Sequence, residues 1–163
     1  MVRRVIEPEL VAYLDKKLEK NGLFHHAVAN NLPRIALVQV AQALVGIKEA
    51  TGRNDGKFIK LIQETVGGAS GEPYCAAGMM TCLAYVELKM KIKSVIVASE
   101  LARDIWTKTP ISMRVKSIPG PGAMAVWADV ASNGKLKITG HTEMVISADD
   151  KQIHCVGFNT SGT

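Results

Sequence analysis

The pattern of apolar residues in this chain changes near residue 110, and this change limits the folds available to it. Before that point apolar residues recur every three or four positions, as on one face of a helix. After it they form short runs separated by turn residues, as strands do. These turns include the Pro-Gly-Pro-Gly run at 119–122 and the hairpin signal Asn133-Gly134. Helices followed by antiparallel strands predict an α+β domain, with N-terminal helices packed against a C-terminal sheet.

Individual elements follow from the same periodicity. We predict helices over residues 8–20, 33–49, 58–66 and 75–91, and a further helix between residues 95 and 106. We predict strands over residues 124–130, 136–147 and 152–158. Between the first two helices we expect a polar loop that contains His25 and His26.

Size and composition indicate one ordinary globular unit. The chain has 163 residues, of which 47% are hydrophobic and 21% are charged, a balance that excludes a disordered or collagen-like chain. The net charge of +5 favours anionic partners such as nucleic acid, acidic lipid or a cell-wall polymer. Nucleic acid is disfavoured because only 5% of residues are aromatic and no basic stripe is interleaved with them. No stretch reaches the roughly 18 apolar residues of a membrane span, so we expect no membrane insertion.

The three cysteines, Cys75, Cys82 and Cys155, are an odd number without a paired spacing, which predicts free thiols. Cys75 follows Pro73-Tyr74 where a helix is expected to begin. Backbone N–H groups and the helix dipole at such a position lower a thiol pKa and favour the nucleophilic thiolate. Position alone leaves open the alternative of a small buried side chain. We expect Cys82 and Cys155 to lie in the core.

A histidine and an asparagine in the strand region are candidate partners for Cys75. His141 begins a strand-like run, so its ring is expected to meet the start of the cysteine helix, as in papain-like nucleophilic catalysis. Asn159 ends the last predicted strand, where its amide would fix the imidazole tautomer, or where it simply ends the strand. The histidines lack the spacing of zinc ligands, so we predict no metal and no other cofactor. His154 is expected to face outward.

These pieces, in this order, resemble the CHAP-type domains (cysteine, histidine-dependent amidohydrolase/peptidase) of bacterial and phage peptidoglycan hydrolases. The similarity runs from about residue 43 to residue 162 and includes Gly-Glu-Pro-Tyr-Cys-Ala-Ala at 71–77 and Gly140-His141. It implies a papain-like cysteine peptidase fold and cleavage of an amide bond in peptidoglycan. The enzyme would be an N-acetylmuramoyl-L-alanine amidase or a peptide endopeptidase. Cys75 would be the nucleophile, His141 the base and Asn159 the group that orients the imidazole.

The chain departs from the family's usual pattern at three positions. Ala123 stands where an aspartate is usual, Glu143 where a glycine often follows the histidine, and Gly157 where many members have a glutamate. By strand alternation Glu143 shares a face with His141, so it is an auxiliary candidate for orienting the ring. Tyr74 is a candidate for lining the substrate cleft. The departures also keep open an alternative function, a catalytically inactive module that binds cell-wall peptide or a protein partner.

The resemblance divides the chain into a helical N-terminal extension, residues 1–33, and a catalytic region, residues 34–163, within one globular unit. Arg3 and Arg4 are followed by Val-Ile-Glu-Pro-Glu, whose charges and proline interrupt any apolar signal region. We therefore expect no signal peptide in these residues. The protein would be made in the cytoplasm and reach the cell wall by phage-type release, or by a signal since removed. The sequence leaves open the oligomeric state and which amide bond is cut.

Overall fold

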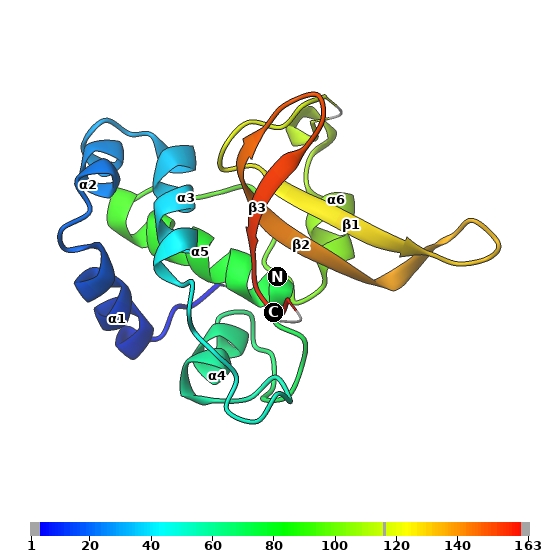
Figure 1. The fold of residues 1–163 in the computed structure, drawn as a ribbon, viewed down its shortest axis with the longest axis horizontal. Helices are drawn as coiled ribbons and strands as arrows, with labels where there is room; N and C mark the ends of the chain where they lie inside the picture. The colour runs from blue at the N-terminus through cyan, green and yellow to red at the C-terminus, as the bar shows by residue number, and fades with distance from the viewer. Residues whose placement is uncertain (1–3, 116, 161–163) are drawn as a thin grey trace.

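The computed structural model describes residues 4–115 and 117–160. Within them the helices are α1 (Pro8–Leu18), α2 (Gly22–Ala29), α3 (Pro33–Ala43), α4 (Lys57–Glu64), α5 (Cys75–Met90) and α6 (Ala102–Lys108). A 3-10 turn (Ile111–Met113) precedes the strands β1 (Met124–Val130), β2 (Leu136–Ala148) and β3 (Ile153–Gly157). The strands form one antiparallel sheet in the order β1-β2-β3. The predicted α+β class, with helices first and an antiparallel sheet afterwards, is confirmed (Figure 1).

Helix α5 lies at the centre of the molecule. Every residue from Cys75 to Val86 is buried, because the helix is apolar on all sides and has neighbours on all sides. Its neighbours are α3, α4, α6 and β2, and α3 crosses it in Figure 1. Leu10, Leu14 and Phe24 of the first two helices belong to the same buried cluster. The N-terminal helices therefore share one core with the rest of the chain.

Helix α2 occupies the segment that we expected to be a polar loop. The Asn21 side chain accepts a hydrogen bond from the Phe24 backbone N–H at 2.9 Å and so begins a new helix. His25 and His26 lie on this helix rather than in a loop. Asn-Gly at 21–22 comes after the end of α1, and its asparagine also caps the start of α2. The sequence pattern indicated the end of the first helix but not the start of a second one.

Two other helices are shorter than predicted. Helix α3 ends at Ala43 rather than near residue 49, and Gly46 follows with a φ of +95°, a value outside any right-handed helix. Helix α6 begins at Ala102 rather than near residue 95. The Ser99 hydroxyl accepts a hydrogen bond from the Leu101 N–H, and such local bonds compete with helix formation. None of the helices in the described ranges is long and apolar enough to cross a membrane.

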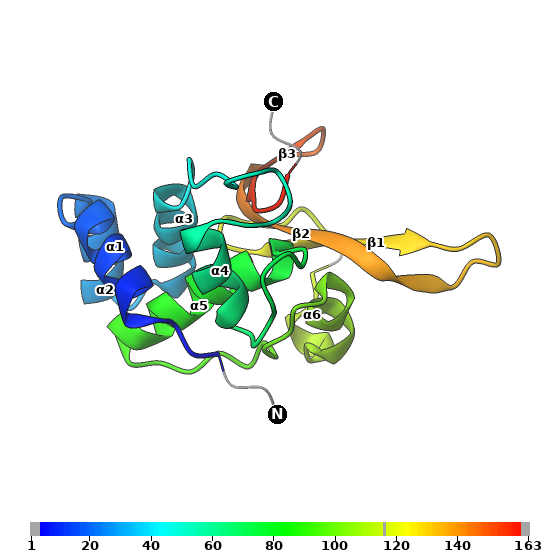
Figure 2. The same ribbon diagram turned by 90° about the horizontal axis from the view of Figure 1, so that it is seen from below.

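The sheet has a core face and an outer face. Met144 and its partner Val156 pack against the core, so Val145 and its partner Cys155 lie on the opposite face, where Val145 is also fully buried. Cys155 is only half-buried, and the prediction that it lies in the core is wrong. Strand alternation along β3 places Cys155 on the face opposite Val156, the residue that packs against the core. The outer ends of β1 and β2 project from the body of the molecule (Figure 2).

Phe158, just after β3, attaches this end of the sheet to α5. Its ring is 93% buried and lies directly over Gly78. A Cβ atom added at Gly78 would lie 2.2 Å from Phe158 Cγ, well inside van der Waals contact. Glycine at this helical position is therefore required by the close approach of an aromatic ring.

We predict that Gly78→Ala destabilises the protein by about 1–3 kcal/mol, because the methyl group forces Phe158 away from α5. Chemical denaturation measures this free energy of unfolding. Gly22→Ala is the matched control: it lies in α2 with nothing within 4 Å of its added Cβ, and we expect a change of at most about 0.5 kcal/mol. Equal stability of the two variants would contradict the assigned packing.

Candidate functional site

Cys75 is the first residue of α5, as predicted, and it is deeply placed. The residue is 5% exposed, and the backbone N–H groups of Thr142 and Ala76 lie against its sulfur. Burial raises the pKa of the Cys75 thiol, and the negative charge of Glu143 adds to the increase. The backbone N–H donors lower the pKa of this thiol, but burial has the larger effect. The prediction that the helix start lowers this pKa is therefore wrong for the resting protein.

His141 is paired with a carboxylate from its own strand. Its Nε2 lies 3.2 Å from Glu143 Oε1, within hydrogen-bond distance. The two side chains are 31% and 22% exposed, so the pair is partly sheltered from water. On the adjacent strand Trp127 stacks against the imidazole, with ring centroids 6.3 Å apart. With Nε2 engaged by Glu143, Nδ1 is the ring nitrogen left for proton transfer.

Thr142 joins the cysteine to the histidine. Its side chain is fully buried and donates to the Ala125 carbonyl oxygen at 2.9 Å, which holds this part of β2 in place. Its backbone N–H lies against the Cys75 sulfur, and its neighbours in sequence are His141 and Glu143. The structure thus brings Cys75, His141 and Glu143 to one short stretch of β2. No hydrogen bond joins the Cys75 sulfur directly to His141 among the described residues.

Glu143 also faces the last strand. It is the direct cross-strand partner of Gly157, and a Cβ at Gly157 would lie 2.6 Å from Glu143 Oε1. The absence of a side chain at Gly157 therefore leaves the space that the Glu143 carboxylate occupies. Glu143 also lies beside the Cys155 thiol, whose pKa is raised to about 11 by burial and then by this charge.

Asn159 makes no hydrogen bond to the imidazole among the described residues. It follows β3 with a φ of +53°, a left-handed conformation that asparagine tolerates better than most residues. Its backbone N–H lies beside the Tyr74 hydroxyl, and no hydrogen bond joins it to His141 in the described part of the chain. The carboxylate that contacts His141 is instead that of Glu143. The orienting role of Asn159 stays a prediction without a contact to support it.

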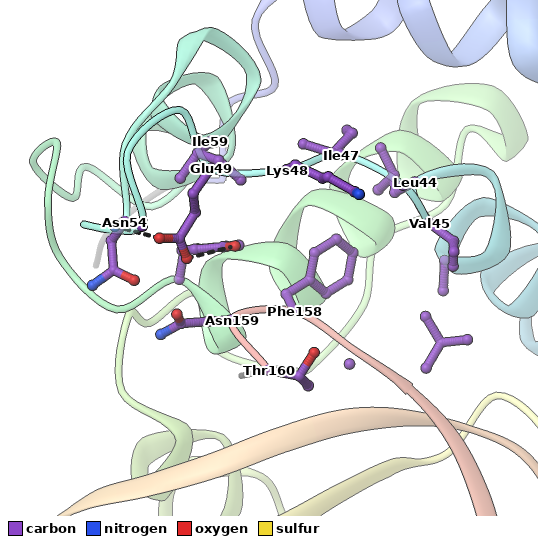
Figure 3. A pocket seen from close by; sticks show the side chains of 16 residues that line it. Leu44, Val45, Ile47, Lys48, Glu49, Asn54, Ile59, Phe158, Asn159 and Thr160 are labelled. Carbon is purple, nitrogen blue, oxygen red and sulfur yellow. Dashed lines mark hydrogen bonds between the residues drawn. The ribbon is translucent and has the colours of Figure 1, made fainter. Parts of the chain in front are cut away.

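A second feature of this region is a cavity of about 860 Å³, which is lined by Tyr74 and by residues at the end of β3. The loop after α3 supplies half of the lining residues, including Lys48, Glu49 and Asn54, while Asn159 lines another side (Figure 3). Tyr74 lines it, and its hydroxyl donates to Glu49 Oε1 at 3.2 Å. Burial first, and then the Glu49 charge, raises the pKa of Tyr74 to about 12. Sequence reasoning did not single out Glu49, because a lone acidic residue in a loop carries no motif.

The remaining histidines take part in local structure. His25 Nε2 lies 3.0 Å from the Glu19 carbonyl oxygen, and His26 Nδ1 lies 3.3 Å from the Asn30 amide nitrogen. His154 is exposed, as predicted. Over residues 4–115 and 117–160, no group of three or more histidine, cysteine or acidic side chains is arranged to hold a metal ion.

The titration of the three thiols tests this electrostatic arrangement. We predict that Cys75 reacts with iodoacetamide with an apparent pKa above the ~8.5 of a free thiol, because burial outweighs the helix start. Glu143→Gln should lower the pKa of both Cys75 and Cys155, because it removes a neighbouring negative charge. Peptide mapping at a series of pH values measures each site, with the fully buried Cys82 as an unreactive reference. A Cys75 pKa below that of a free thiol would contradict the prediction.

Comparison of the chain with protein-family models, with curated proteins and with solved structures finds no significant match.

Proposed function

We propose that this protein is a papain-like cysteine hydrolase that cleaves an amide bond in peptidoglycan, either as an N-acetylmuramoyl-L-alanine amidase or as a peptide endopeptidase. The observation that supports it best is the position of the Cys75 sulfur against the backbone of Thr142, the residue between His141 and its carboxylate partner Glu143 in sequence. A cysteine at a helix start beside an oriented imidazole is the arrangement that nucleophilic amide cleavage needs. The resemblance to CHAP-type domains supplies the substrate class.

The proposed reaction begins from a neutral thiol, because burial raises the pKa of Cys75. His141 Nδ1 accepts the thiol proton as the sulfur attacks the amide carbonyl. The backbone N–H of Cys75 donates to the resulting oxyanion at the start of α5. His141 then gives its proton to the leaving amine, and a thioester remains on Cys75. Water, deprotonated by His141, hydrolyses the thioester and restores the thiol.

In this proposal Glu143, rather than Asn159, is the positioning residue for His141. CHAP-type domains often have glycine two residues after the histidine and glutamate two residues before the asparagine. Here those two residue types are exchanged, at Glu143 and Gly157. Positions 143 and 157 are direct cross-strand partners. A carboxylate from either strand would therefore occupy about the same space beside the imidazole. The glutamate at position 143 thus compensates for the missing glutamate at position 157.

A second candidate function is a binding module without turnover. The observation in its favour is the burial of Cys75, which leaves 5% of the residue exposed and keeps its thiol protonated at neutral pH. A protein of this kind would hold cell-wall peptide or a protein partner with the same surface. It would retain binding when Cys75 is replaced and would release no product.

We predict that Cys75→Ala lowers the clearing of cell-wall suspensions by at least ~1000-fold while the fold is retained, because it removes only the nucleophilic sulfur. Cys82→Ala is the matched control in the same helix. Cys82 is fully buried, so this variant should lose about 1–2 kcal/mol of stability and keep its activity. Turbidity and mass spectrometry of released fragments measure the reaction and identify the bond. Near-normal clearing by Cys75→Ala would remove it as the nucleophile.

A reciprocal exchange tests the positioning role of Glu143. Glu143→Gly should lower kcat by roughly 10–1000-fold, because the imidazole loses its hydrogen-bond partner while nucleophile and base remain. Gly157→Glu should also lower kcat, because its side chain collides with Glu143. The double variant, Glu143→Gly with Gly157→Glu, should recover much of the loss. Asn159→Ala should retain most of its activity. Severe loss in Asn159→Ala, with no recovery in the double variant, would return the role to Asn159.

A further inference from the structure

The cavity beside Tyr74 holds two opposite charges that do not neutralise each other. Glu49 and Lys48 both line it, and no ion pair joins them among the described residues. In Figure 3 the Glu49 carboxylate and the Lys48 ammonium point toward opposite ends of the cavity, with the Phe158 ring beside the space between them. A cavity of about 860 Å³ is large enough for several amino-acid residues of a ligand.

Glu49 is held in a fixed position by its neighbours. One carboxylate oxygen accepts from the Asn54 backbone N–H at 2.8 Å, and the other accepts from the Tyr74 hydroxyl at 3.2 Å. A carboxylate has about four acceptor positions, so this arrangement leaves capacity for a further donor. No lysine or arginine forms an ion pair with Glu49 in the part of the chain that the structure describes. A half-buried carboxylate without a cationic partner favours a ligand that supplies one.

The cavity is also next to the proposed catalytic residues. Tyr74, which lines it, immediately precedes Cys75. Gly157, which also lines it, is the cross-strand partner of Glu143. The cavity thus shares a wall residue with each side of the proposed site: Tyr74 is the sequence neighbour of the nucleophile, and Gly157 is the strand partner of Glu143.

We propose that this cavity binds the free end of a peptide that carries both an ammonium side chain and a terminal carboxylate. Glu49 binds the ammonium group and Lys48 the carboxylate, while the aliphatic part of the peptide packs on Phe158. This inference rests on the proposed function, because an uncross-linked peptidoglycan stem peptide that contains lysine has both groups. The cavity would then select stem peptides whose lysine amine and terminal carboxylate are free.

Calorimetry with synthetic peptides tests the proposal directly. The protein is the full chain carrying Cys75→Ala, so that no peptide is hydrolysed. The probes are the N-acetylated stem tetrapeptide acetyl-Ala-γ-isoglutamine-Lys-Ala, whose only charges are the lysine ammonium and the terminal carboxylate, the same peptide acetylated on the lysine amine, and the same peptide with its terminal carboxylate amidated. We expect each modification to weaken binding at least ~10-fold, in the range of a lost charge-assisted hydrogen bond.

Matched variants assign each charge to its partner. With Glu49→Gln added, acetylation of the lysine should no longer matter, while amidation still weakens binding. With Lys48→Met added, the reverse should hold. Because the ligand changes are first made against the unaltered cavity, the test does not depend on the folding of these variants. Equal binding of all three peptides, or no binding at millimolar concentration, would overturn the proposal.

The outcomes separate this inference from the proposed function. If wall hydrolysis depends on Cys75 but peptide binding does not depend on the two charges, the proposed hydrolase function is supported and the proposed peptide site in the cavity is rejected. Charge-dependent binding without any hydrolysis by the unaltered protein would sustain the binding site and favour the module without turnover.

Discussion

The burial of helix α5 is the constraint on which the rest of the structure depends. A helix with apolar side chains on all faces must be covered on all faces, and α3, α4, α6 and β2 provide that cover. Gly78 allows Phe158 to approach closely, so the end of β3 is held against the same helix. The first turn of α5 is thereby placed at the sheet, and Cys75 with it.

This placement creates a conflict between packing and reactivity. The helix start offers N–H groups that favour a thiolate, but the burial that stabilises α5 disfavours any charge there, and burial has the larger effect on the Cys75 pKa. The reaction that we propose accommodates this, because the thiol proton leaves only as the sulfur attacks.

Glu143 and Gly157 can be interpreted only when their pairing across the two strands is known. Along the chain, each is an isolated departure from the pattern of CHAP-type domains, and together they weaken the resemblance. In the sheet they face each other, and the missing side chain of one provides the space for the carboxylate of the other. The carboxylate that lies beside His141 therefore comes from the histidine's own strand.

Local patterns in the sequence determined the fold class, the bounds of α5 and β1, the start of α5 at Cys75 and the shared face of His141 and Glu143, because helical periodicity and strand alternation are local properties. Tertiary structure decided the rest. Asn21 caps a second helix, although the sequence pattern indicated only that a helix ends there, and Cys155 lies on the sheet face opposite the core residue Val156. Burial raises the Cys75 pKa, no hydrogen bond joins Asn159 to His141 among the described residues, and Glu49 lines a cavity. Each of these depends on burial, strand register or approach between residues distant in sequence, and no local pattern contains that information.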